Sequence, residues 1–255
     1  MRTTILIGLI LFISQAEARV FSFKDAGLAA YLRGHWGFSS VNKDPFANSS
    51  GVDTSVGDQS DFQYGGEFGV AMGLGSAFAL RLGAEVTQHG PVSEAVGTGP
   101  TDAERFKLES SVFIFTPMVT VEYIYTAGPS TRYYFAVGAG LADVTVDNRY
   151  TMTDLGTSDL GVSSFNEKMS AQGTSYHFLT GLETSFVDNT TLSLDIGYRY
   201  LPINELKYKG DVNNIVSPTG VSKGDTVFNA DGSKRTLDLS GAYVGLTFRF
   251  YLHFL

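Results

Sequence analysis

The sequence predicts an all-β fold: a transmembrane eight-stranded antiparallel up-and-down β-barrel with short periplasmic turns and long extracellular loops. Three observations predict it. Apolar and polar residues alternate over eight segments, short and long connections alternate between those segments, and an export signal precedes them. Bacterial outer-membrane barrels combine an even number of alternating strands with this pattern of connections.

The first eighteen residues have the order of a secretory signal peptide. Arg2 supplies a positive charge, residues 5–13 form an apolar run, and Ala-Glu-Ala at 16–18 is a small-x-small cleavage site. The apolar run is far shorter than the ~20 residues that a membrane-spanning helix needs. We therefore expect residues 1–18 to be removed and residues 19–255 to form one outer-membrane β-barrel domain.

The composition excludes several kinds of site. The chain has no Cys, which excludes disulfides, zinc–thiolate sites and cysteine nucleophiles. The formal net charge of −8 argues against nucleic acid as a partner. Only 17% of residues are charged, whereas Gly numbers 29 and aromatic residues make up 13%. That mixture suits strands that face lipid on one side and a crowded interior on the other.

The first four predicted strands carry an apolar residue at every second position, which is the period of a strand with two different faces. The opposite face carries Gly, Thr and charged residues. These strands cover residues 28–38, 62–72 and 78–87, followed by a fourth strand that ends at Tyr125.

The second four strands continue the pattern over residues 133–146, 175–186, 192–200 and 242–254. In the first of them the alternation is lost near Asp143, where we expect a β-bulge. The last strand is the most regular, and its apolar face consists of Ala242, Val244, Leu246, Phe248, Phe250, Leu252 and Phe254.

The connections alternate in length, which is the topological signal. Short turns are predicted at residues 74–77, 126–131 and 187–190. Long connections rich in Gly, Ser, Asn and Asp are predicted at residues 39–61, 88–110, 147–173 and 202–235. Short turns in the periplasm and long loops outside are the rule for outer-membrane barrels. An even number of strands then places both termini in the periplasm.

The apolar face has aromatic residues near the strand ends, as expected of girdles at the two membrane interfaces. A soluble sandwich would instead turn its polar face to water. The predicted outer rim has Trp36, Phe38, Phe62, Tyr64, Tyr198 and Tyr200, and the predicted inner rim has Tyr123, Tyr125, Tyr133, Phe250 and Phe254.

The opposite face carries charges of both signs. An eight-stranded barrel is just wide enough to be filled by side chains, and unpaired buried charge is costly, so we expect these residues to pair inside the lumen. We expect Arg81 to cluster with carboxylates of neighbouring strands. We expect Arg249 to find a carboxylate of the seventh or the first strand, with Asp195 the better candidate because its strand is adjacent. The predicted lumen network consists of Arg33, Glu67, Arg81, Glu85, Glu122, Glu183, Asp195, Arg199 and Arg249. The expected cluster around Arg81 comprises Glu67, Glu85 and Glu122.

The stretch from Gly241 to Phe254 resembles the C-terminal insertion signal of outer-membrane proteins, with Phe248, Phe250, Leu252 and Phe254 at alternate positions and Leu255 one residue beyond the pattern. The segments 133–140 and 194–200 resemble hairpin motifs of the OmpA/OmpX/OmpW-like superfamily of small outer-membrane β-barrels. The resemblance implies a place in the Gram-negative outer membrane, among its lipids and lipopolysaccharide. It also implies insertion by the barrel assembly machinery, and we expect a monomer. It implies no single activity.

No catalytic, cofactor-binding or metal-binding residue is predicted. Ser175, His177 and Glu183 lie on one face, but alternation explains their spacing, and that face is the lumen rather than the side from which a lipid would approach. The four His are scattered, and the loop Asp residues lack the spacing of a calcium loop.

Three functional classes remain open. A structural or surface-display barrel is favoured, because charged residues lie on most inward faces. A narrow channel or transporter for small or hydrophobic compounds is the alternative, and it would need a continuous passage. A lipid A-modifying enzyme is the third class, and we expect no enzyme activity.

Overall fold

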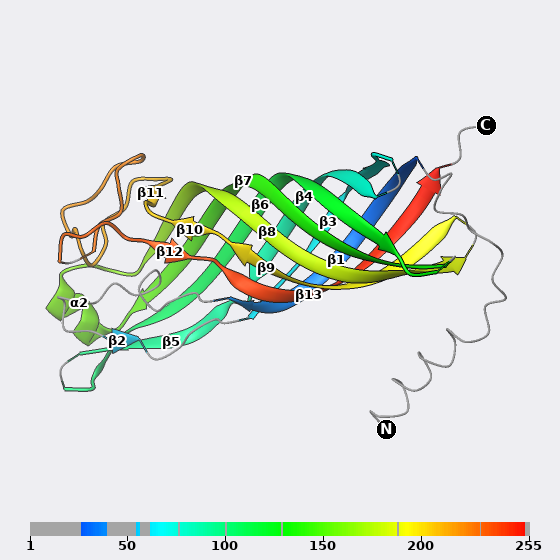
Figure 1. Ribbon diagram of the computed structural model, residues 1–255. Helices are drawn as coiled ribbons and strands as arrows, with labels where there is room; N and C mark the ends of the chain where they lie inside the picture. The colour runs from blue at the N-terminus through cyan, green and yellow to red at the C-terminus, as the bar shows by residue number, and fades with distance from the viewer. Residues whose placement is uncertain are drawn as a thin grey trace, which may run out of the picture.

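The computed structural model describes residues 27–39, 55–56, 62–75, 77–99, 101–128, 130–187, 189–229 and 231–252. Eight antiparallel strands form a closed ring, because the last strand pairs with the first (Figure 1). The eight predicted strands are thereby confirmed. The predicted signal peptide lies outside the described residues. In ring order the strands are β1 (Leu28–Ser39), β3 (Phe62–Gly73), β4 (Phe78–His89), β6 (Glu104–Thr126), β7 (Thr131–Met152), β8 (Phe165–Val187), β9 (Thr190–Tyr200) and β13 (Gly241–Leu252).

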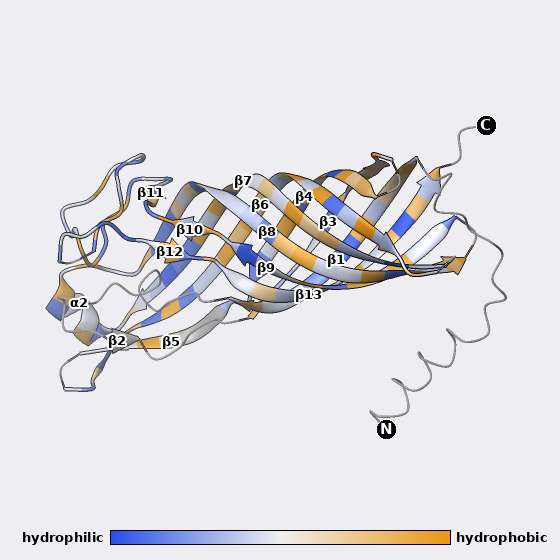
Figure 2. Cartoon of the chain, in the orientation of Figure 1, coloured by the Kyte–Doolittle hydropathy of each residue, from blue (hydrophilic) through white to orange (hydrophobic). Residues whose placement is uncertain are grey.

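Side-chain burial alternates along the ring with the predicted phase. On β1, Trp36 and Phe38 are exposed by 49% and 69%, whereas Arg33 and His35 are buried. Figure 2 shows hydrophobic and hydrophilic residues alternating along the barrel strands. A broad apolar outer band of this kind is a surface for lipid, and a closed ring leaves no unpaired strand edge within it. Within the described residues, no helix is long and apolar enough to cross a membrane.

Three strands are about twice as long as the other five. β6, β7 and β8 contain 23, 22 and 23 residues, whereas the others contain 11 or 12. Their extra length forms a sheet beyond one end of the ring (Figure 1), which we call the extension (residues 104–112, 143–152 and 165–174). Much of what the sequence predicted as long connections at 88–110 and 147–173 is therefore strand.

The chemistry of the two strand faces is exchanged where the extension begins. On β7, the outward residues change from Val137 and Leu141 to Asp143, while the inward ones become Val144 and Val146. The pairing of β7 with β8 continues through Asp143 without a shift of register. The predicted β-bulge at Asp143 is therefore wrong: the alternation changes its chemistry there and keeps its phase.

The fourth long connection is folded rather than open. Residues 201–239, which we call the cap, include β10 (Pro202–Ile203), β11 (Lys207–Tyr208) and β12 (Leu237–Asp238). β11 pairs with β8, and β10 pairs with β12. Cap residues pack on the inward face of the extension, and on ring residues next to it, in one apolar core. From the cap it contains Leu201, Ile203, Leu206, Tyr208, Val227, Leu237 and Leu239, and from β6, β7 and β8 it contains Phe106, Leu108, Val112, Ile114, Ala142, Val144, Val146, Tyr150 and Met169.

Smaller elements complete the extension. β5 (Val92–Thr98) pairs with β6, and β2 (Ser55–Val56) pairs with β5. The helix α2 (Asp154–Leu160) joins β7 to β8, with Thr153 as its N-cap and Gly161 after its last turn. The short predicted turns lie at the other end of the ring, joining β3 to β4, β6 to β7, and β8 to β9.

Candidate functional site: the charged lumen and its cap

The buried charges of the described residues are balanced in sign. Five Arg and five carboxylates lie in the ring, and a separate pair, Arg235 and Glu167, lies in the apolar core under the cap. The ring set consists of Arg33, Arg81, Arg132, Arg199 and Arg249 with Glu67, Glu85, Glu122, Glu183 and Asp195. All nine residues predicted for the lumen are therefore in the interior, and Arg132 is the member that the sequence analysis missed.

Six of these ten residues form a chain of ion pairs in the part of the lumen nearer the short turns. Each Arg in it contacts one or two carboxylates from other strands. The N–O distances are 2.9 Å for Arg81–Glu67, 3.0 Å for Arg81–Glu122, 2.7 Å for Arg249–Glu122, 3.4 Å for Arg249–Glu183 and 2.8 Å for Arg132–Glu183.

The other four residues lie nearer the cap. Arg33 contacts Asp195 at 2.5 Å and Glu67 at 3.4 Å, so it joins the two groups. Arg199 contacts Glu85 at 3.1 Å, and Glu85 lies 4.0 Å from Arg33. The ten charged groups thus form one continuous network across the lumen.

One predicted pairing is wrong. Arg249 reaches across the lumen to Glu122 rather than sideways to Asp195, which Arg33 takes instead. The predicted cluster around Arg81 is present: Glu67 and Glu122 contact Arg81 directly, and Glu85 joins them through Arg33. Adjacency of strands guided the predictions, but a guanidinium on a long stem crosses a narrow barrel as readily as it reaches the next strand.

Tyrosine side chains fill the space between the charges. The Tyr31 hydroxyl donates to Glu67 at 2.5 Å, and its ring lies beneath Arg81 at 4.5 Å. Tyr243 lies similarly beneath Arg33 at 4.7 Å. Because the buried Arg and carboxylate side chains of the network are at most 7% exposed, no water-sized passage runs along them.

The pair under the cap belongs to a smaller polar cluster. Arg235 contacts Glu167 at 3.0 Å, and Asn214 donates to Glu167 at 3.1 Å. Burial disfavours the charged guanidinium, but Glu167 beside it prevails and raises the pKa of Arg235. Burial raises the pKa of Tyr208, whose hydroxyl accepts from Asn214, to about 12. This ion pair therefore joins the cap to the extension.

The three residues considered for hydrolysis do not form a triad. The Ser175 hydroxyl lies 2.8 Å from His177 Nε2, but Glu183 is bound to Arg132 and Arg249. All three side chains are fully buried. Among the described residues, no group of three or more acidic or His side chains could hold a metal ion.

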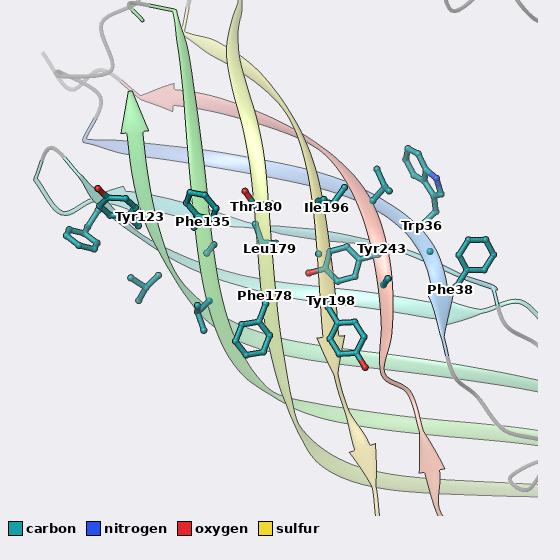
Figure 3. A pocket seen from close by; sticks show the side chains of 18 residues that line it. Trp36, Phe38, Tyr123, Phe135, Phe178, Leu179, Thr180, Ile196, Tyr198 and Tyr243 are labelled. Carbon is teal, nitrogen blue, oxygen red and sulfur yellow. The ribbon is translucent and has the colours of Figure 1, made fainter. Parts of the chain in front are cut away.

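An open hollow of about 860 Å³ lies on the outer face of the ring rather than in the lumen. Figure 3 shows Trp36, Phe38, Phe178 and Tyr198 standing off the strands that carry them. These are outward, exposed residues of the apolar band. The hollow is therefore part of the lipid-facing surface. The same band includes Phe248, Phe250 and Leu252 of the predicted insertion signal, whereas Phe254 lies outside the described residues.

No family model matches the sequence, and no curated protein matches it. Solved structures of outer-membrane proteins do show similarity. The protein OprG from Pseudomonas aeruginosa has 12% identity and a TM-score of 0.47, over 89% of this chain and 98% of that one. The protein Ail of Yersinia pestis, in complex with the heparin analogue sucrose octasulfate, has 12% identity and a TM-score of 0.41, over 88% and 99%.

A protease is also among the similar structures. OmpT from Escherichia coli has 8% identity and a TM-score of 0.46, over 92% of this chain and 99% of that one. The closed ring of eight strands and its apolar outer band, rather than any one of these likenesses, identify the chain as a small transmembrane β-barrel of the outer-membrane type.

Proposed function

We propose that this protein is an exported, non-conducting barrel that holds a folded structure at the surface of a Gram-negative cell. The observation that carries the proposal is the sealed interior. Ten buried charges of balanced sign fill the lumen, and an apolar core closes the end beneath the cap. A barrel built for passage would need a continuous lining in contact with water.

The outward face of the extension supports a place outside the membrane. It carries exposed ion pairs, Arg149 with Glu109 at 3.6 Å and Lys168 with Asp147 at 3.1 Å. Such a surface suits water and the polar head groups of lipopolysaccharide, directly above a band that suits lipid tails. In this orientation the short turns and both termini are periplasmic, and the assembly machinery inserts the chain by its last strand. The function needs no catalytic site.

The experiment is a planar-bilayer recording of the purified barrel, with an open porin as the positive control. We expect no steady conductance at neutral pH. A steady conductance would overturn the proposal in favour of the channel or transporter.

The orientation of the barrel in the membrane is tested separately, by labelling single introduced cysteines in intact cells. The chain has no Cys of its own, so only the introduced residue reacts. Lys223→Cys in the cap should react with a membrane-impermeant maleimide. Ala127→Cys in the turn between β6 and β7 should react only after the outer membrane is opened. The reverse pattern would place the cap in the periplasm.

A further inference from the structure

One side chain connects the charged lumen to the cap directly. Arg199, at the end of β9, contacts Glu85 at 3.1 Å and Thr87 at 2.9 Å, and it also donates to Gln63. Its Nε donates to the carbonyl of Leu239, a cap residue, at 3.3 Å. The position of Arg199 therefore affects both the lumen network and the contact between the cap and the end of the ring.

Three buried histidines surround this arginine. His177 Nδ1 lies 3.3 Å from the Tyr243 hydroxyl and 4.0 Å from Glu85. His35 Nε2 lies 3.2 Å from Thr87 Oγ1, and its ring lies 5.6 Å from that of Tyr243. Thr87 contacts both His35 and Arg199, and Glu85 lies beside both His177 and Arg199.

The third histidine is the least satisfied. His89 is fully buried, and neither of its ring nitrogens has a hydrogen-bond partner. It is paired across β3 and β4 with Gln63, which accepts from Arg199. His35 Nδ1 and Ser39 Oγ are also buried without partners. Buried polar groups of β1 and β4 therefore lie together at this level of the lumen, close to Arg199.

Within the described part of the lumen, every carboxylate already has an Arg partner. The five carboxylates of the ring are already matched by five Arg, and Glu85, the carboxylate nearest His177, is shared by Arg199 and Arg33. A proton on any of the three histidines would add positive charge beside Arg199. Buried charge of one sign is relieved by letting in water or by moving apart.

We propose that His35, His89 and His177 form an acid-responsive latch, in which protonation displaces Arg199 and releases the cap from the mouth of the barrel. The latch rests on the proposed function in one respect: the cap faces the cell exterior, so external acid reaches it. The closed state holds the histidines neutral, and the released state exposes them to water. The ratio of released to closed molecules then rises as the pH falls below the ordinary imidazole value of about 6.5, by up to about tenfold per histidine for each pH unit.

The test measures the position of the cap by a distance between two spin labels. Lys223→Cys in the cap and Thr151→Cys on β7 are both exposed positions, and the parent chain has no Cys to interfere. Pulsed electron–electron double resonance is recorded in liposomes at about pH 7.5 and about pH 5. We expect one short distance at neutral pH and an additional, longer distance in acid.

Variants separate the latch from other effects of acid. The combined variant His35→Gln, His89→Gln and His177→Gln should keep the short distance at both pH values, whereas His253→Gln should behave like the parent. Arg199→Gln should show the longer distance already at neutral pH, which tests the latch even where the triple variant does not insert.

Three outcomes would overturn the latch. They are a parent distance distribution that is the same at both pH values, an acid response that persists in the triple variant, and an Arg199→Gln variant that keeps only the short distance at neutral pH. None depends on conductance, so failure of the latch is distinguishable from failure of the sealed-barrel function.

Discussion

The two sections of β6, β7 and β8 show the same period and opposite chemistry. In the ring, apolar residues such as Val137 face outward and charged residues such as Glu122 face inward. In the extension, Asp147 and Arg149 face outward and Val146 faces inward. Side chains alternate between the two faces along the whole length of a strand. The identity of the residues therefore decides which face is apolar, and this choice is reversed between the ring and the extension.

The interiors differ as much as the surfaces. Buried ion pairs, whose groups have lost their hydration, fill the interior of the ring. Their geometry is specific, and the loss of one partner lowers the stability strongly because the other charge is left buried and unpaired. The extension and cap are held by apolar packing, with Arg235 and Glu167 as one polar connection. The extension and cap thus have an apolar core of their own, built on strands that continue from the ring.

The largest expected effect comes from breaking the ring network. Glu122→Gln leaves Arg81 and Arg249 short of one anion, and it should lower the free energy of unfolding by about 3–5 kcal/mol. Urea unfolding from lipid vesicles measures this. Glu109→Gln, on the exposed face of the extension, is the control and should change the free energy by less than about 1 kcal/mol. Equal losses would mean that the lumen charges are hydrated.

The cap core should respond to a cavity. Leu108 is fully buried on the inward face of the extension, and Leu108→Ala should cost about 2–5 kcal/mol. We expect trypsin to cut more readily at Lys209, while the heat-dependent shift of the folded barrel on a gel is unchanged. Lys107→Ala, on the outward face, serves as the matched variant. Loss of the folded gel band with Leu108→Ala would show that ring and cap fold as one unit.

A charge placed on the outward face of β7 should locate the boundary between the two sections. Val137→Arg, within the lipid-facing band, should cost about 2–4 kcal/mol. Thr151→Arg, on the same face and strand but in the extension, should change the stability by less than about 0.5 kcal/mol. Unfolding in vesicles compares the two. If both substitutions were neutral, the outer band would not be in contact with hydrocarbon.

The smallest effect is expected at an exposed ion pair. Asp147→Asn removes the partner of Lys168, which lies 3.1 Å away, and should cost less than about 1 kcal/mol because water and salt screen both groups. Raising the salt concentration should erase the difference from the parent. A loss as large as that of Glu122→Gln would contradict the division between a wet surface and a dry lumen.

The sequence alone determined the eight strands, their phase and the sign of each face in the ring. It could do so because period-two alternation is a local property, visible in neighbouring residues. Arg132 was within reach of the same rule, since it lies in phase with Tyr134 and Ala136, but its place beside the predicted turn concealed it. The extension has the same period of two, but its apolar residues face inward and its polar residues face outward. The sequence analysis looked for the opposite arrangement, which holds in the ring, and therefore predicted these residues as loops.

Only the tertiary structure decided which charges meet and where the cap lies. Arg249 and Glu122 are 127 residues apart in sequence, and Arg199 and Glu85 are 114 apart. Their contacts depend on the curvature and tilt of a closed sheet, which no local pattern encodes. The cap has little regular alternation of its own. Its residues are apolar where they meet the extension, so its fold follows from a surface that the rest of the chain must first build.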